Sequence, residues 1–164
     1  MPYEGSWLWR LRQSVGTDLV LVPGAVVVVE QADRRVLFIR RSDTEEWSFP
    51  GGAVEEDDTF VLAAMHELRE EAGLEANEND LLAFASVSDP RWVRFAFPNG
   101  DEVHSFNLCF VLRRWAGEPE PDGAEAIDVG FFDAAHPPAP LSSLADRVLE
   151  LHQSFTATGA FQNG

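Results

Sequence analysis

The pattern of apolar and polar positions divides the chain into short strands and a few amphipathic helices. A β-branched run within residues 24–30 predicts a strand that is buried on both faces, and residues 36–40 predict a second strand after a polar turn. We expect these two strands to pair as a hairpin. In residues 6–15, Trp and Leu alternate with Arg, which is typical of either a short amphipathic helix or a first strand.

A longer amphipathic helix is predicted over residues 59–72, and Gly73 is expected to end it in the left-handed conformation. Its apolar residues recur at intervals of four, which places them on one face that we expect to pack against the core. These residues are Phe60, Ala64, Leu68 and Ala72.

The second half of the chain alternates strand patterns with turn signals. The Asn99-Gly100 pair is a strong hairpin signal between the two central strands. The expected elements are strands over 81–88, 91–97, 102–115 and 126–132 and a closing helix over 141–155. We therefore expect one domain over residues 1–164, with an N-terminal extension at 1–20 and a flexible tail at 158–164.

Composition supports a folded protein, since 45% of the 164 residues are hydrophobic. The net charge of −16 would repel a nucleic-acid backbone, so nucleic acid is not an expected partner. Cys109 has no second cysteine to pair with and lies in an apolar run, which predicts a buried, inert thiol and fits a reducing cytoplasm. No secretory signal or apolar span of about 20 residues is present, so membrane association is not expected either.

Three carboxylates share one side of the helix predicted over 59–72. Glu67, Glu70 and Glu71 stand at positions i, i+3 and i+4, where like charges cost a helix roughly 0.2–0.5 kcal/mol per pair. Either solvation of an acidic helix face or a bound cation must offset this repulsion. Divalent cations prefer several oxygen ligands, so a metal site is the sharper hypothesis.

The spacing of these residues resembles the signature of the Nudix hydrolase family. Gly52 is followed at the family's intervals by Asp58, by His66-Glu67-Leu68, by Glu70-Glu71 and by Gly73-Leu74. All but two of the defined positions match the family pattern. Asp58 stands where the family has Glu, and His66 stands where it has Arg.

The segment from Gly52 to Leu74 is the Nudix box of this chain, and segments outside the box extend the resemblance to about residues 20–135. Residues 37–41 and 47–52 are similar to the strand and turn that lead into the box, and residues 125–133 are similar to the family's strand before its last helix. The resemblance implies an α/β/α sandwich around a mixed, mostly antiparallel sheet, which is compatible with the predicted element order. It also implies a pyrophosphohydrolase that depends on Mg²⁺ or Mn²⁺.

Metal ligands are assigned from the same resemblance. We expect Glu70 and Glu71 to bind the metal, and Glu67 to share it or to help activate water. Glu125 is a further candidate ligand, because it is similar to an acidic residue that many family members bring from a later loop. Three neighbouring acids are rivals for that role, and a solvated loop position is the alternative for Glu125 itself. The rivals are Glu118, Glu120 and Asp122.

The two departures fall on a pair that in the family braces the loop against the helix. A brace between Asp58 and His66 would be shorter than the usual one, and it would weaken as the pH rises through the histidine range near about 6.5. Changing both members could preserve the brace or could mark a box with reduced catalytic precision. We favour an active enzyme, because the three carboxylates are retained.

Substrate contacts are assigned more broadly. Gly51 and Gly52 allow the backbone to approach a ligand closely. Arg40 and Arg41 could bind phosphate, with salt bridges to Asp43 or Glu45 as the alternative.

A nucleobase needs an aromatic or apolar wall. Trp92 and Phe95 could stack on such a base, with a place in the core as the alternative for both aromatic residues.

The expected function is metal-dependent hydrolysis of a phosphoanhydride in a small-molecule nucleotide. Nucleotide sugars such as ADP-ribose, dinucleoside polyphosphates and nucleoside triphosphates are the substrate classes left open. One rival is a weakened box that binds a nucleotide as a regulatory module, and another is an acidic interaction protein that holds Ca²⁺ structurally. A homodimer built through the Trp-rich N-terminal segment is a further expectation.

Overall fold

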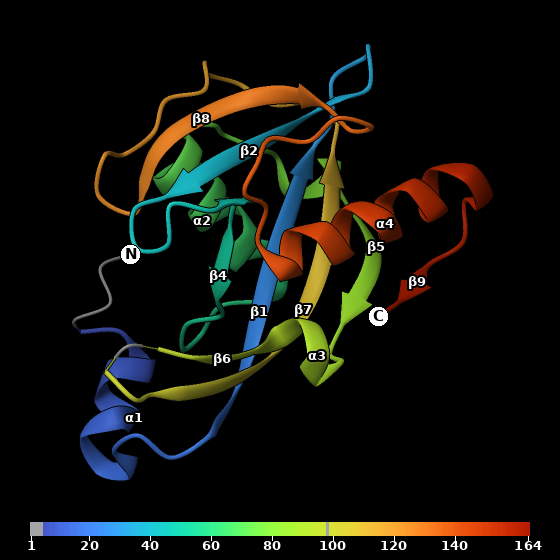
Figure 1. The fold of residues 1–164 in the computed structure, drawn as a ribbon. Helices are drawn as coiled ribbons and strands as arrows, with labels where there is room; N and C mark the ends of the chain where they lie inside the picture. The colour runs from blue at the N-terminus through green and yellow to red at the C-terminus, as the bar shows by residue number, and fades with distance from the viewer. Residues whose placement is uncertain (1–4, 98) are drawn as a thin grey trace.

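The computed structural model of the protein describes residues 5–97 and 99–164 (Figure 1). Local signals in the sequence set the ends of its longer helices. The elements in chain order are α1 (Trp7–Val15), β1 (Val20–Val29), β2 (Arg35–Arg41), β3 (Trp47–Ser48), β4 (Gly51–Ala53), α2 (Phe60–Ala72), the 3₁₀ turn η1 (Glu78–Asp80), β5 (Leu81–Val87), α3 (Pro90–Val93), β6 (Arg94–Ala96), β7 (Glu102–Leu112), β8 (Ala126–Asp133), α4 (Ser143–Thr158) and β9 (Gln162–Asn163).

The strands form two sheets. The larger sheet has the order β4-β1-β7-β5-β9, with β6 paired to β7. In it β1 is parallel to β7 and β9 is parallel to β5, whereas the other pairs are antiparallel. The smaller sheet is antiparallel, with the order β3-β2-β8.

Helices cover both faces of the larger sheet (Figure 1). Alternate residues of β1 point to opposite faces: Val26 and Val28 belong to the apolar cluster that includes α4, whereas Val27 and Val29 belong to the cluster that includes α2. Because β1 is buried on both faces, its sequence is a continuous run of valines rather than an alternating pattern. The expected α/β/α sandwich around a mixed, mostly antiparallel sheet is confirmed.

The predicted pairing of the first two strands as a hairpin is wrong. Beyond a single antiparallel bridge between Glu30 and Val36, β1 joins the larger sheet and β2 joins the smaller one. The sequence predicted each strand correctly, but a short polar turn does not specify which neighbour each strand pairs with. The predicted hairpin is present between β6 and β7, and its Gly100 has a positive φ of 90°. Its first strand is shorter than the expected 91–97, because residues 90–93 form the helix α3.

Regular structure lies near both ends of the described residues. Of the two expectations for residues 6–15, the helix is correct: α1 begins after Ser6, whose side chain accepts a hydrogen bond from the Trp9 N–H. At the other end, residues 162–163 form β9 on the edge of β5 rather than part of a loose tail. Among the described residues, no helix combines the length and apolar character needed to cross a membrane.

Candidate active site

Helix α2 carries the carboxylates, and its ends follow the predicted signals. The Thr59 side chain accepts a hydrogen bond from the Leu62 N–H at 3.2 Å, and Gly73 ends the helix in the left-handed region at a φ of 68°. Leu68 is fully buried against the sheet, which orients the helix. Phe60 departs from the predicted apolar face, since 37% of its surface is exposed at the first turn of the helix.

Glu71 is the most buried carboxylate of this helix, with 2% of its surface exposed. Its Oε2 accepts a hydrogen bond of 2.9 Å from the Gly51 N–H at the start of β4. Burial, reinforced by repulsion from Glu67, raises the pKa of Glu71 to about 8. The helix therefore holds a carboxyl group at the edge of the sheet that is costly to ionise without a cation.

Glu67 lies one turn earlier and packs on the next residue of β4. A Cβ atom added to Gly52 would overlap Oε1 of Glu67, so only glycine leaves room for this carboxylate. Burial raises the pKa of Glu67 to about 7, with further contributions from Glu125 and Glu70. The adjacent glycines therefore serve different partners, Gly51 donating to Glu71 and Gly52 making space for Glu67.

Glu125 belongs to the same electrostatic cluster although it comes from the loop before β8. It raises the pKa values of both Glu67 and Glu71, which places its charge near theirs. The Glu125 carbonyl accepts a hydrogen bond of 2.9 Å from the Ser42 N–H at the end of β2. This contact holds the loop against the strand that carries Arg41.

Two of the rival acids make other contacts. The Asp122 carboxylate accepts hydrogen bonds from backbone N–H groups of residues 124–126 and thereby shapes the loop. The Glu120 N–H donates to the Ala72 carbonyl at the end of α2. Glu118 is exposed. Among the candidates for the later ligand, Glu125 is thus the one whose charge acts on Glu67 and Glu71.

Both arginines of β2 form the salt bridges that were the alternative to phosphate binding. Arg40 pairs with Glu45 at 2.8 Å and Arg41 pairs with Asp43 at 2.9 Å. Burial opposes the charge of Arg41, yet the hydrogen bonds that it donates to Asp43 raise its pKa, and the charges of Glu71 and Glu125 add to this effect. Arg41 is therefore a cation beside the carboxylates.

Asp58 and His66, the two residues that depart from the family pattern, lie next to each other. The Nδ1 atom of His66 lies 3.3 Å from Oδ2 of Asp58, within hydrogen-bonding distance. The Asp58 side chain is 16% exposed and the His66 side chain 38% exposed. The structure thus pairs the end of the loop with the helix through these two residues.

The donor set suits a hard divalent cation. Glu67, Glu70, Glu71 and Glu125 offer carboxylate oxygens. Burial first, and then repulsion between neighbouring carboxylates, raises the pKa values of Glu67 and Glu71, and a bound cation would favour their ionised forms. Within residues 5–97 and 99–164, however, no three carboxylate, imidazole or thiol side chains are already arranged to hold a metal ion. The chemistry of the carboxylate donors nevertheless fits a divalent metal.

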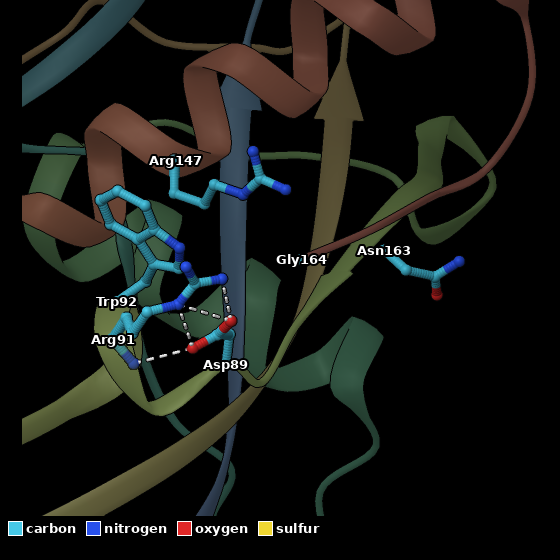
Figure 2. Close-up of a pocket in the computed structure, with 6 residues that line it drawn as sticks. All are labelled: Asp89, Arg91, Trp92, Arg147, Asn163 and Gly164. Carbon is cyan, nitrogen blue, oxygen red and sulfur yellow. Dashed lines mark hydrogen bonds and ion pairs between the residues drawn. The ribbon is translucent and has the colours of Figure 1, made fainter.

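Trp92 lies away from these carboxylates. It packs against the apolar cluster of α4, on the face of the sheet opposite to α2. With Arg91, Arg147 and neighbouring residues it lines an open pocket of about 530 Å³ (Figure 2). The structure therefore does not bring Trp92 together with the other predicted site residues, because α3 places it on the opposite layer.

A contact between α1 and the loop of the box, residues 54–59, has no signal in the local sequence. Glu55 Oε2 accepts a hydrogen bond of 3.0 Å from the Trp7 N–H, and Arg10 forms an ion pair with Glu56. These partners are separated by 48 and 46 residues. No local pattern could have indicated them, because the Trp7 contact uses a backbone group.

Comparison with known proteins agrees with this architecture. The NUDIX domain family model matches residues 20–152. An RNA pyrophosphohydrolase of Halorhodospira halophila is 37% identical over 76 residues, which are 46% of this chain and 40% of that protein. The chain thus spans less than half the length of this curated relative.

Solved structures share the fold. A MutT NUDIX hydrolase from Burkholderia pseudomallei aligns with a TM-score of 0.67 at 21% identity, covering 80% of this chain and 98% of the other. An ADP-ribose pyrophosphatase from Streptococcus suis aligns with a TM-score of 0.63 at 22% identity, covering 87% and 98%. The family model covers most of the chain, so the resemblance read from the box is confirmed, and the protein belongs to the NUDIX domain family.

Proposed function

We propose that the protein is a divalent-metal-dependent pyrophosphohydrolase that cleaves a phosphoanhydride bond in a nucleoside diphosphate linked to another group. The observation that carries this proposal is the packing of Glu71 and Glu67 on the Gly51 and Gly52 backbone within a NUDIX domain. Two neighbouring carboxyl groups with raised pKa values favour a cation as their partner. Mg²⁺ is the proposed metal, with Mn²⁺ as a substitute.

Each side chain has a proposed role in the reaction. Glu70 and Glu71 hold the metal together with Glu125, and Glu67 shares it or accepts the proton of the attacking water. The water oxygen bonds to a phosphorus of the anhydride, the bridging P–O bond breaks, and its electron pair leaves with the departing phosphate. A bound divalent cation supplies charge neutralisation on the phosphates. Arg41 adds a positive charge beside them.

A panel of candidate substrates can identify the substrate class. Relatives named for ADP-ribose and for RNA put ADP-ribose and 5′-triphosphorylated RNA on this panel, beside nucleotide sugars, diadenosine polyphosphates and nucleoside triphosphates. The net charge of −16 disfavours the RNA, because a polyanion is repelled by the surface as a whole. We therefore expect a small nucleotide to be the better substrate.

The proposal is tested by phosphate release from this panel with Mg²⁺ or Mn²⁺. The Glu70→Gln/Glu71→Gln double variant should lose turnover, whereas Glu118→Gln, at an exposed loop position, should retain it. Glu125→Gln should raise the metal concentration needed for half-maximal rate if Glu125 is a ligand. Tight nucleotide binding without turnover of any substrate would instead favour the alternative, a regulatory nucleotide-binding module.

A further inference from the structure

Helix α1 lies outside the region matched by the family model, yet it packs against the loop of the box. The matched region begins at residue 20, whereas α1 covers Trp7–Val15. One apolar side of α1 contacts the strands next to this loop, including β4. The residues of this small cluster are Val20, Val22 and Val103, with Trp7, Leu8, Leu11, Val15 and Ala53 packed against them.

The first turn of α1 is joined to the loop by a hydrogen bond. The Trp7 N–H has no partner within its own helix, as is usual for the first residues of a helix, and it donates to Oε2 of Glu55 at 3.0 Å. A carboxylate at this position also interacts favourably with the positive end of the helix dipole. Both groups are partly buried, so solvent competes less for this bond than for one on the surface.

The other end of α1 is fixed to the central sheet. Arg12 is buried and donates hydrogen bonds to the carbonyl groups of Gly16 at 3.0 Å, Asp18 at 2.5 Å and Glu102 at 2.6 Å. Glu102 is the first residue of β7. Because α1 is held at its far end by the sheet, its first turn offers Glu55 a fixed point of attachment.

Glu55 stands at the exit of the strand that contacts the carboxylates. Gly51 and Gly52 face Glu71 and Glu67, and the Val54 N–H then donates to the Pro23 carbonyl of β1 at 2.9 Å. Glu55 follows immediately and ends this attached segment. Its side chain contacts α1, so the segment is held from β1 on one side and from α1 on the other.

We infer that α1 braces the loop of the box through Glu55, and that Glu55 is a positioning residue that keeps Gly51 and Gly52 in register with Glu71 and Glu67. This inference rests on the proposed function for its effect on turnover. It assigns Glu55 no contact with substrate or metal. Its effect is to fix the backbone on which the carboxylates pack, and small displacements of such groups cost catalysis heavily.

The test compares Glu55→Ala, Glu55→Gln and Glu56→Ala. Loss of the bond in Glu55→Ala should lower kcat by about tenfold or more with KM within about twofold, and should weaken Mn²⁺ binding measured by calorimetry. Glu55→Gln should restore most of both, because its amide oxygen can accept the same hydrogen bond. Glu56→Ala is the matched control: it removes the same charge one residue away, and its pair with Arg10 is exposed on both sides.

Native-state hydrogen exchange adds a measurement that needs no turnover. Faster exchange of the Trp7 and Gly51 amides in Glu55→Ala, with an unchanged rate in Glu56→Ala, supports the brace even if that variant is less stable overall. Wild-type rates, kcat and Mn²⁺ affinity in Glu55→Ala would overturn it, and so would a Glu55→Gln variant as impaired as Glu55→Ala. A wild-type protein without hydrolase activity would refute the proposed function, while the exchange and Mn²⁺ data would still decide the brace.

Discussion

The adjacent glycines Gly51 and Gly52 of β4 have different neighbours. We therefore expect substitution of one to affect mainly stability and substitution of the other to affect mainly activity. A Cβ at Gly51 would overlap the Ala25 carbonyl oxygen and approach the Val26 Cα to 3.0 Å, and this backbone cannot move cheaply. We expect Gly51→Ala to lower the free energy of unfolding by about 1–3 kcal/mol, as overpacking usually does. Thermal unfolding should show a melting temperature lower by roughly 2–4 °C for each kcal/mol.

Gly52→Ala should affect activity more than stability, in contrast to Gly51→Ala. Its added Cβ meets the end of a flexible side chain, the Glu67 carboxylate, which can rotate away at little cost to folding. We expect a melting temperature close to that of the wild type but a kcat at least about tenfold lower, because the displaced carboxylate leaves its working position. Equal losses of stability in the two variants would contradict this assignment of neighbours.

We expect the enzyme to tolerate substitution of His66 in its pair with Asp58. The two side chains lie at 3.3 Å and the His66 side chain is 38% exposed, so their interaction is worth no more than about 1 kcal/mol. His66→Arg keeps a donor within reach of Asp58, and we expect kcat to change by roughly fivefold or less. Complete loss of turnover in steady-state assays, with the fold retained, would show that this pair is not a simple brace.

At the scale of elements, the attachment of α1 depends on one buried guanidinium. Arg12→Met keeps most of the side-chain volume but leaves three carbonyl groups without their donors. The expected loss is roughly 3 kcal/mol of unfolding free energy, measured by urea denaturation. Arg10→Met is the control in the same helix, because Arg10 is 49% exposed and its removal should cost less than about 1 kcal/mol. Similar losses in both variants would contradict the anchoring role.

Elements specified by local signals were predictable, whereas their partners were not. The ends of α2 follow from the Thr59 cap and from Gly73, both visible in the sequence. The pairing of β1 with β7 and the addition of β9 to β5 depend on contacts between distant residues. The two polar residues of β9, Gln162 and Asn163, give no strand signal, so this strand could be found only from the fold.

The same division applies to the candidate site. The spacing of Glu67, Glu70 and Glu71 is local, and it predicted that the three carboxylates share a helix, which is α2. The sequence could not indicate that Trp92 lies on the opposite layer, since that follows from where α3 enters the sandwich. Nor could it indicate the bond between Glu55 and the backbone of Trp7, because any residue at position 7 except proline offers the same donor.

For the whole molecule, the ionisable groups fall into sets that act in different pH ranges. Several aspartates have lowered pKa values, as at Asp89, where hydrogen bonds from Arg91 lower the pKa to about 2. Their contribution to stability is lost only in acid. Burial lowers the pKa of His152, so this histidine favours folding more strongly as the pH rises toward the ordinary histidine value of 6.5. Among the described residues, Glu67 and Glu71 are the groups whose pKa values are raised into the range between about 7 and 8.

The raised pKa values of Glu67 and Glu71 determine how the free energy of unfolding depends on pH. The folded protein holds protons on Glu67 and Glu71 up to pKa values of about 7 and 8, whereas the unfolded chain releases them near the ordinary glutamate pKa of 4.5. The folded state therefore binds more protons, and stability falls as the pH rises, on the order of 1 kcal/mol per pH unit for each group.

In EDTA, urea unfolding should show a lower free energy of unfolding at about pH 8 than at about pH 6.5. Mg²⁺ should reverse most of this loss, because it binds the ionised carboxylates of the folded state alone. Glu71→Gln should flatten the profile in EDTA, and a wild-type stability that is constant over this range would refute the buried, protonated state of the pair.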